Sequence, residues 1–389
     1  MNISYWVADF GNALGQQMID GHYFEMPSSI SEITEKEFNG LFANHIAIDK
    51  VEEHLVIKWI DEETARYFMA GKRAQTELLG NAHIYSLHDK TNSMTVWVTW
   101  MAGLALYHAT KFPESTEVHV NVEYFGTLLP VWLVKKAASF REKLSVMAAK
   151  FQTDVSFELL TPGLARTFHV SVQQSESRIE GENARHALKY DLEGNQRDDA
   201  KRYHTAFVVM NDMGGQSQDL CKLQPGLSAA QTADDFSSST DQSYLSLIEK
   251  LRSDKLMDYF QSLRELERFI LTHIQSRKFV YRHPITHQDT DLTDIIVPVL
   301  QDFCEVALQK ALQSFSFRQG DEVIYVHIGG VNELLQYYMQ EYLVGLLGKE
   351  VVDKYHVFPQ DSRKLNIYAS AIVAKNYLKR QAEKANRAE

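Results

Sequence analysis

Residues 207–217 combine a buried strand pattern with residue types that could bind a phosphate and a divalent cation. An apolar run at 207–210 leads into Asp212, which is followed by Gly214 and Gly215. Glycines permit positive φ angles and let backbone N–H groups approach an anion, and a carboxylate at a strand end can hold a hydrated cation beside that anion. The stretch therefore suits a nucleotide phosphate with Mg²⁺, although the same pattern also forms ordinary tight hairpins.

Two other apolar strand patterns, at residues 3–8 and 323–328, end in similar junctions. Asp9 could instead be a turn carboxylate that caps its own loop, and the glycine pair after residue 328 alone could be a simple strand-to-helix turn. The repeated strand, carboxylate and glycine at the first two junctions predict a chain built from two related halves. The three junctions contain Asp9, Gly11, Asn12, Asp212, Gly214, Gly215, Gln216, Ser217, Gly329, Gly330, Val331 and Asn332.

Length and composition indicate a soluble globular protein with two ordinary domains or one large duplicated unit: 389 residues, 44% hydrophobic and 23% charged. The formal net charge of -11 argues against direct nucleic-acid binding over a broad surface, so we expect any contact with DNA to be made by another protein. Cys221 and Cys304 are too few for a disulfide framework or a zinc site. With no membrane-length apolar run and no basic leader, these features predict a cytoplasmic protein without a membrane partner.

Hydrophobic periodicity predicts an alternation of strands and helices that would place the three junctions at strand ends. Residues 224–242 are rich in Ser, Thr and Asp and are expected to form a solvated loop. Beyond the junction strands, expected strands cover residues 46–48, 55–57, 118–122, 155–159 and 167–172. Expected helices cover residues 62–71, 92–110, 131–149, 177–190, 244–260, 263–275, 292–315 and 368–387.

The order of the junctions resembles the phosphate-one, phosphate-two and adenosine motifs of the actin-like ATPase superfamily. The resemblance narrows to the ParM group of bacterial actin-like proteins, which segregate plasmids, through Pro27-Ser28, Tyr67 to Gly71 and Leu129-Pro130. It implies an α/β fold of two similar ribonuclease-H-like domains, each a βββαβα unit, that face each other across a nucleotide cleft. Domain I would cover residues 1–175, with the C-terminal helix 361–389 returning to it, and domain II would cover residues 176–360.

The resemblance also implies roles for individual residues. Asp9 and Asp212 would hold Mg²⁺, and the two glycine hairpins would donate hydrogen bonds to the phosphates of ATP or GTP. The third junction would pass beside the nucleoside. Glu176 corresponds to the glutamate that orients the attacking water in this group, although it could equally be a favourable carboxylate in the first turn of a helix.

Two departures from the family pattern affect the expected nucleotide site. Gln16 stands where the family has a lysine that neutralises the phosphates, so a cation from elsewhere or a greater dependence on Mg²⁺ is expected. Val331 replaces the third glycine of the adenosine motif, and Asn332 replaces the small residue after it. Base preference is therefore open between ATP and GTP.

The function implied by the resemblance is a nucleoside triphosphatase that polymerises into filaments for plasmid segregation. Its partners would be further copies of itself in a head-to-tail polymer, and an adaptor protein bound to centromere-like plasmid DNA. Two alternatives stay open from the sequence. One is a non-polymerising phosphotransferase of the same superfamily, and the other is a degenerate scaffold that binds nucleotide without hydrolysing it.

Overall fold

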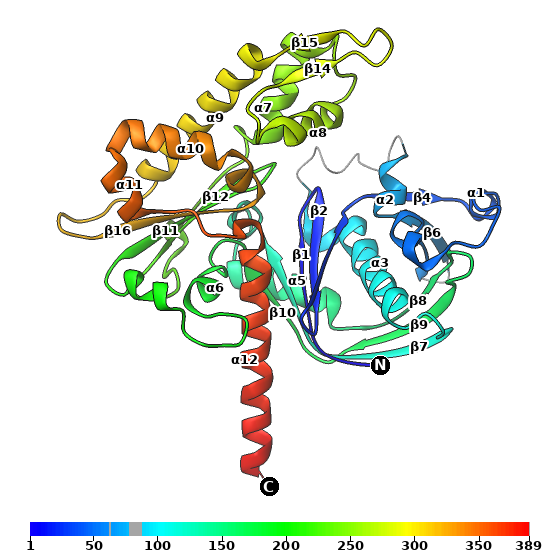
Figure 1. Ribbon diagram of the computed structural model, residues 1–389. Coiled ribbons are helices and arrows are strands. Elements are labelled where there is room, and N and C mark those ends of the chain that lie inside the picture. The colour runs from blue at the N-terminus through cyan, green and yellow to red at the C-terminus, as the bar shows by residue number, and fades with distance from the viewer. Residues whose placement is uncertain (62–63, 78–87, 389) are drawn as a thin grey trace.

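The computed structural model describes residues 1–61, 64–77 and 88–388, and it shows two α/β domains built around separate sheets (Figure 1). The N-terminal domain contains a ten-stranded mixed sheet, and the second domain contains a five-stranded sheet. This arrangement confirms the predicted actin-like architecture. The domain boundaries at residues 175 and 360 remain a prediction.

The first sheet has the order β3-β2-β1-β7-β9-β8-β5-β6-β4, and β10 pairs with the second half of β7. The long strand β7 runs parallel to β1, β9 and β10, so that β1 and β10 end at the same edge of the sheet. Its strands are β1 (Asn2–Phe10), β2 (Leu14–Ile19), β3 (His22–Pro27), β4 (Ile30–Ile33), β5 (Val56–Asp61), β6 (Thr64–Ala70), β7 (Glu117–Leu129), β8 (Asp154–Leu159), β9 (Arg166–Val172) and β10 (Ser175–Ile179).

Helix α3 packs on this sheet, and most of its residues are buried. Trp100 of α3 stacks on Trp6 of β1 with ring centroids 5.1 Å apart. This contact helps to set the position of β1 relative to the helix. The helices of this half are α1 (Glu35–Asn39), α2 (Lys72–Gln75), α3 (Met94–Lys111), α4 (Val131–Lys135), α5 (Phe140–Phe151) and α6 (Arg185–Lys189).

The second sheet has the order β13-β12-β11-β16-β17, and β11 and β16 are parallel, so that their ends also lie together. Its strands, with those of a separate hairpin, are β11 (Phe207–Met213), β12 (Gln218–Leu223), β13 (Phe236–Ser239), β14 (Val280–Arg282), β15 (Asp289–Asp291), β16 (Val323–Ile328) and β17 (His356–Val357). The helices are α7 (Tyr244–Leu251), α8 (Leu263–His273), α9 (Thr293–Gln313), α10 (Gly330–Leu347) and α11 (Lys349–Tyr355).

The final helix α12 (Leu365–Ala388) returns to the first domain and packs on β1 (Figure 1). Its apolar side, including Ile367 and Ala371, is buried against Val7 and Tyr124. The exposed end of the helix projects beyond the body of the protein (Figure 1). Among the helices in the described ranges, none has the length and apolar character needed to cross a membrane.

Several sequence-based assignments were wrong. The predicted helix 62–71 is strand β6 over its residues 64–70, because pairing with β4 and β5 overrides local helix preference; residues 62–63 lie outside the described ranges. The predicted strand 46–48 leads into a 3₁₀ helix, Ile48–Glu53. The predicted helix 177–190 begins as strand β10, and only α6 is helical.

Two further predictions were only partly right. The predicted helix 131–149 is interrupted between α4 and α5, where Ser139 caps a new start by accepting a hydrogen bond from the amide of Glu142. The expected loop 224–242 contains strand β13, which extends the second sheet by pairing with β12.

Candidate functional site

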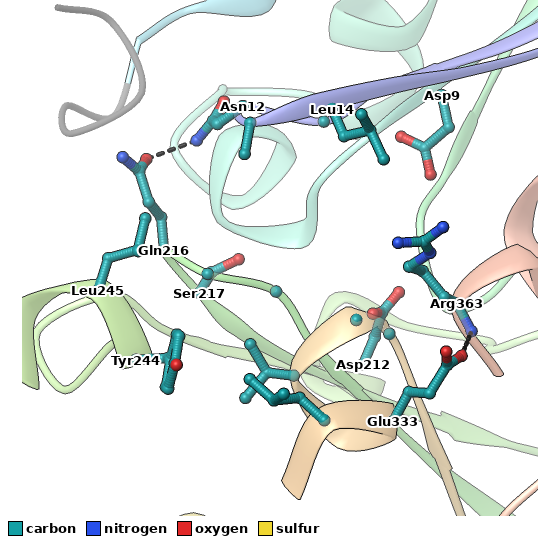
Figure 2. Close-up of a pocket in the computed structure, with 18 of the residues that line it drawn as sticks. Asp9, Asn12, Leu14, Asp212, Gln216, Ser217, Tyr244, Leu245, Glu333 and Arg363 are labelled. Carbon is teal, nitrogen blue, oxygen red and sulfur yellow. Dashed lines mark hydrogen bonds between the residues drawn. The ribbon is translucent and has the colours of Figure 1, made fainter. Parts of the chain in front are cut away.

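A cavity of about 520 Å³ lies where the strand ends of the two domains face each other (Figure 2). All three glycine junctions contribute to its wall, although they are widely separated in the sequence. The expected site residues that line it are Asp9, Gly11, Asn12, Gln16, Asp212, Gly214, Gly215, Gln216, Ser217, Gly329, Gly330 and Val331.

Two hairpin loops enter the cavity from opposite domains. One connects β1 to β2, and the other connects β11 to β12, where the amide of Gly214 donates to the carbonyl of Ser217 at 3.0 Å. The side-chain amide of Asn12 in the first loop donates to Oε1 of Gln216 in the second at 2.5 Å (Figure 2). The loops are therefore already joined across the cavity, which is the arrangement needed to enclose a chain of phosphates from both sides.

The third junction depends on a glycine at position 329. Gly329 has a φ of +94°, and a Cβ atom there would lie 2.5 Å from both Oδ1 of Asp212 and the carbonyl oxygen of Met213. Only glycine tolerates this backbone conformation together with such a close approach. The backbone at the start of α10 is thereby held directly against the Asp212 carboxylate.

Replacement of Gly329 by alanine should displace the Asp212 carboxylate and weaken nucleotide binding. We expect a loss of about 1–3 kcal/mol in the free energy of unfolding from backbone strain. The matched control is Gly345→Ala in the same helix, where a Cβ would meet nothing within 4 Å; an exposed helical glycine should instead gain about 1 kcal/mol on this change. Urea unfolding and nucleotide titration of both variants check this, and equal effects of the two changes would contradict it.

The cavity carries a surplus of carboxylates. Burial raises the pKa of Asp9 to about 8, and the nearby carboxylates of Glu180 and Asp212 add to that shift. Burial, with a contribution from the carboxylate of Glu180, raises the pKa of Asp212 to about 7. The hydrogen bond of 2.8 Å that Asn366 donates to Asp212 acts in the opposite direction. Carboxylates with raised pKa values gain most from a bound cation, because a cation restores the charged form that burial disfavours.

These oxygen ligands fit Mg²⁺. Asp9 and Asp212 come from different domains and both line the cavity, so a hydrated cation between them could be held through water by either carboxylate (Figure 2). Asp219, on β12 beside Asp212, is not among the described residues that line the cavity, and it accepts hydrogen bonds from the amide of Val131 at 3.2 Å and from the hydroxyl of Ser238. Asp9 and Asp212, which the sequence predicts as Mg²⁺ ligands, thus line the same cavity.

The raised pKa of Asp9 predicts how stability changes with pH. A carboxyl group with a higher pKa in the folded protein stabilises the fold most below about pH 4, and this contribution is lost as the pH rises through about 8. Without Mg²⁺ and nucleotide, the unfolding free energy of the wild type relative to that of Asp9→Asn should therefore fall from pH 5 to about pH 8. Thermal unfolding of both proteins along this series measures the difference, and a difference independent of pH would contradict the assignment.

A buried lysine partly offsets the negative charge. Lys90, 4% exposed, lines the cavity and lies 2.8 Å from Oε1 of Glu180. Burial acts to lower its pKa, but the carboxylates of Glu180 and Asp9 outweigh it, and the pKa of Lys90 is raised. The ammonium group therefore stays charged inside the cavity, and it could neutralise phosphate in the absence of a lysine at position 16.

Gln16 itself joins the first domain to the 3₁₀ turn Ser362–Lys364, which precedes α12. Its amide nitrogen donates to the carbonyl of Arg363 at 3.1 Å, while its Oε1 is buried without a hydrogen-bond partner among the described residues. The guanidinium of Arg363 pairs with Glu25 on β3. Arg363 also lines the cavity (Figure 2). Arg363 is thus a second cation at the site, next to the position where the family has its lysine.

Two expected site residues lie away from the cavity. Glu176 is the second residue of β10, where it accepts a hydrogen bond from the hydroxyl of Tyr124 at 2.7 Å and pairs with Arg178 at 2.6 Å. Asn332 is buried, and its amide donates to the backbone carbonyls of Asn211 and Ile328. Neither side chain lines the cavity. The hydrogen bonds of Asn332 instead link α10 to the second sheet.

Glu180 occupies the place at the cavity that was expected for Glu176. It follows the last residue of β10, its amide donates to the carbonyl of Leu129 at 2.9 Å, and it lines the cavity. The sequence does carry a signal for it, since Glu180 and Gly181 repeat the strand, carboxylate and glycine order of Asp9 and Asp212. The repeat was not recognised because β10, the strand before Glu180, is mostly polar.

The far end of the cavity is more apolar. Leu245, Leu271 and Ile274 of the α7 and α8 region line it together with Tyr244. Glu267 of α8 also lines the cavity, and burial raises its pKa. An apolar end with one carboxylate suits a base and ribose, whose hydroxyl and amino groups can donate to that carboxylate.

Comparisons with known proteins agree with this geometry. The sequence profile of the Alp7A C-terminal domain matches residues 207–362. The crystal structure of the actin-like protein Alp7A is 33% identical, with a TM-score of 0.91 and coverage of 100% of both chains. None of the curated proteins compared with the chain matches it.

Two ParM structures show the same fold at low identity. Bacillus thuringiensis ParM with ATP is 13% identical, with a TM-score of 0.63 over 96% of this chain and 98% of that one. A 15-stranded ParM filament from Clostridium botulinum is 12% identical, with a TM-score of 0.67 over 97% and 100% of the chains. At these identities the likeness extends to the fold alone.

Proposed function

The chain belongs to the Alp7A family of actin-like proteins, and from that premise we propose that it binds and hydrolyses ATP or GTP with Mg²⁺ in the interdomain cavity. The observation that carries the proposal is the meeting of three glycine junctions around buried carboxylates of both domains. The ParM structure solved with ATP has the same fold and adds support.

The two hairpins would hold the phosphates. Gly11 and Asn12 would donate from the first domain, and Gly214, Gly215 and Ser217 from the second, with Gln216 joining the loops. Asp9 and Asp212 would hold Mg²⁺ through water, and the bound cation supplies charge neutralisation on the phosphates. Gly329, Gly330 and Val331 would form the surface beneath the nucleoside.

Glu180 would orient the attacking water. Its carboxylate lines the cavity at the end of β10, close enough to Asp9 and Asp212 to raise the pKa of each. A carboxylate in this position can accept a hydrogen bond from a water and direct it at a terminal phosphate. Lys90 would hold Glu180 in place and lend positive charge to the same region.

Nucleotide state would control assembly into head-to-tail filaments for plasmid segregation. Because the cavity lies between the two domains, a ligand that contacts both loops favours one relative position of the domains and so one shape of the end surfaces. Heterologous contacts of this kind extend into a polymer. The net charge of -11 is consistent with a cytoplasmic protein that reaches centromere-like plasmid DNA through an adaptor protein.

High-speed sedimentation of the full chain with Mg-ATP, Mg-GTP or no nucleotide tests this function. We expect nucleotide-dependent pelleting, together with phosphate release, and loss of both in Asp212→Ala. Phosphate release without pelleting at any protein concentration would identify a non-polymerising enzyme of the superfamily. Nucleotide binding without phosphate release would identify a degenerate scaffold.

A further inference from the structure

Three potential metal-binding side chains lie on the open face of the first sheet, away from the nucleotide cavity. Along β7, Glu117 and His119 are exposed and alternate with the buried Val118 and Val120. His169 of β9 is the direct parallel partner of His119 across the two strands. Neighbouring residues in register point to the same side of a sheet, so the two imidazoles lie next to each other.

The three side chains converge at their tips. Nε2 of His119 lies 3.5 Å from Oε1 of Glu117, and Nε2 of His169 lies 3.7 Å from the same oxygen. One ligand atom from each of the three residues lies within 4.8 Å of the other two. The imidazole rings are 4.9 Å apart at their centroids and 21° from parallel.

We propose that Glu117, His119 and His169 form a binding site for a divalent transition metal of the Zn²⁺ type. Bonds of about 2.05 Å to a tetrahedral ion place adjacent ligand atoms about 3.3 Å apart. The observed separations of 3.5 and 3.7 Å therefore need only small side-chain rotations to close around one ion. Two imidazoles and a carboxylate are a common ligand set for zinc, and water can fill the fourth position.

A second interaction prepares His169 for this role. Nδ1 of His169 is 2.8 Å from the hydroxyl of Ser156 on the neighbouring strand β8. Metal-binding histidines usually have their other ring nitrogen held in this manner, which fixes the tautomer and aims the free nitrogen at the ion. Ser156 is therefore a positioning residue, and the site joins three adjacent strands.

The site is separate from the nucleotide cavity in both place and chemistry. Glu117 and His119 lie at the beginning of β7, whereas the opposite end of the same strand leads to Pro130 at the nucleotide cavity. A second cavity of about 480 Å³ is lined by His119 and His169 and gives room for coordinating water. Imidazole ligands select zinc, copper or nickel over Mg²⁺, which prefers oxygen.

Isothermal titration of the full-length, tag-free protein with ZnCl₂ alone tests the proposal. We expect stoichiometric binding that weakens at least tenfold in His119→Ala and in His169→Ala. In Ser156→Ala we expect the affinity for Zn²⁺ to fall roughly 10-fold or more. His204→Ala, which removes an exposed histidine elsewhere, should retain the wild-type affinity.

Two further readouts separate a metal site from a folding defect. Zn²⁺ should raise the melting temperature of the wild type and of His204→Ala but not that of His169→Ala, and Co²⁺ should give visible absorption typical of tetrahedral coordination. Excess Mg²⁺ should not compete. Absence of stoichiometric zinc binding by the wild type, or unchanged binding in both His119→Ala and His169→Ala, would overturn the proposal.

Discussion

Replacement of Glu180 by glutamine should reduce nucleotide hydrolysis by about 10²–10⁴-fold while nucleotide binding is retained. Glutamine keeps the size of the side chain but removes the charge that orients and polarises a water. The change also removes a negative charge beside Asp9 and Asp212, so Mg²⁺-dependent affinity should stay the same or rise. Phosphate release and nucleotide titration, measured on the same preparation, give the two quantities.

Glu176→Gln is the matched control for this experiment. Glu176 lies on β10, the strand that leads to Glu180, but its side chain contacts Tyr124 and Arg178 instead of the cavity. We expect hydrolysis within about threefold of the wild type and at most a small loss of stability, since its ion pair is partly exposed. If Glu176→Gln abolished hydrolysis and Glu180→Gln did not, the role expected from the sequence for Glu176 would be correct.

The sequence was most informative where short-range signals set the structure. A strand that ends in a carboxylate and glycine leaves few backbone conformations, so the junctions at Asp9 and Asp212 were recognisable without tertiary information. The ends of parallel strands meet at one edge of a sheet, as β11 and β16 do, but β1 and β11 belong to different sheets. The meeting of the Asp9 and Asp212 junctions was therefore expected only from the resemblance to the actin-like superfamily. The fold and most of the residues of the cavity wall followed from the order of the three junctions, which resembles that of the superfamily.

The sequence failed where long-range contacts decide. In β10, Ser175 and Ser177 face the interior and Glu176 and Arg178 face the other side, so the strand has no apolar signature and resembles a polar helix. Its identity depends on pairing with β7, which a single sequence does not show. Because a helix was predicted over residues 177–190, the catalytic role was assigned to Glu176 near the start of β10 instead of Glu180 after its end.

Lys90 was missed for a different reason. It lies in a short 3₁₀ turn, Lys90–Asn92, and nothing in the local pattern marks it as buried. Its environment is created by Glu180 and Asp9, which are far from it in the sequence. Because Gln16 replaces the family's lysine, a cation from elsewhere was expected, and the residues that the structure describes place Lys90 and Arg363 at the cavity.

Replacement of Lys90 by methionine should have the largest combined effect on binding and stability. The change leaves Glu180 without its partner in a buried place, and breaking a buried pair in this way costs about 3–5 kcal/mol. It also removes a positive charge that acts on Asp9 and Asp212, so nucleotide affinity should fall by one to two orders of magnitude. Lys58→Met is the control, because Lys58 of β5 forms a partly exposed pair with Glu158 of β8 at 2.7 Å. Its loss should cost less than about 1 kcal/mol.

A double variant separates the two roles of Lys90. In Lys90→Met combined with Glu180→Gln, neither side chain is charged, so most of the lost unfolding free energy should return. Nucleotide affinity should stay low if the ammonium group contacts phosphate, because that contact is still missing. Urea unfolding and nucleotide titration of the single and double variants complete the cycle, and recovery of affinity together with stability would show that Lys90 acts only by holding Glu180 in place.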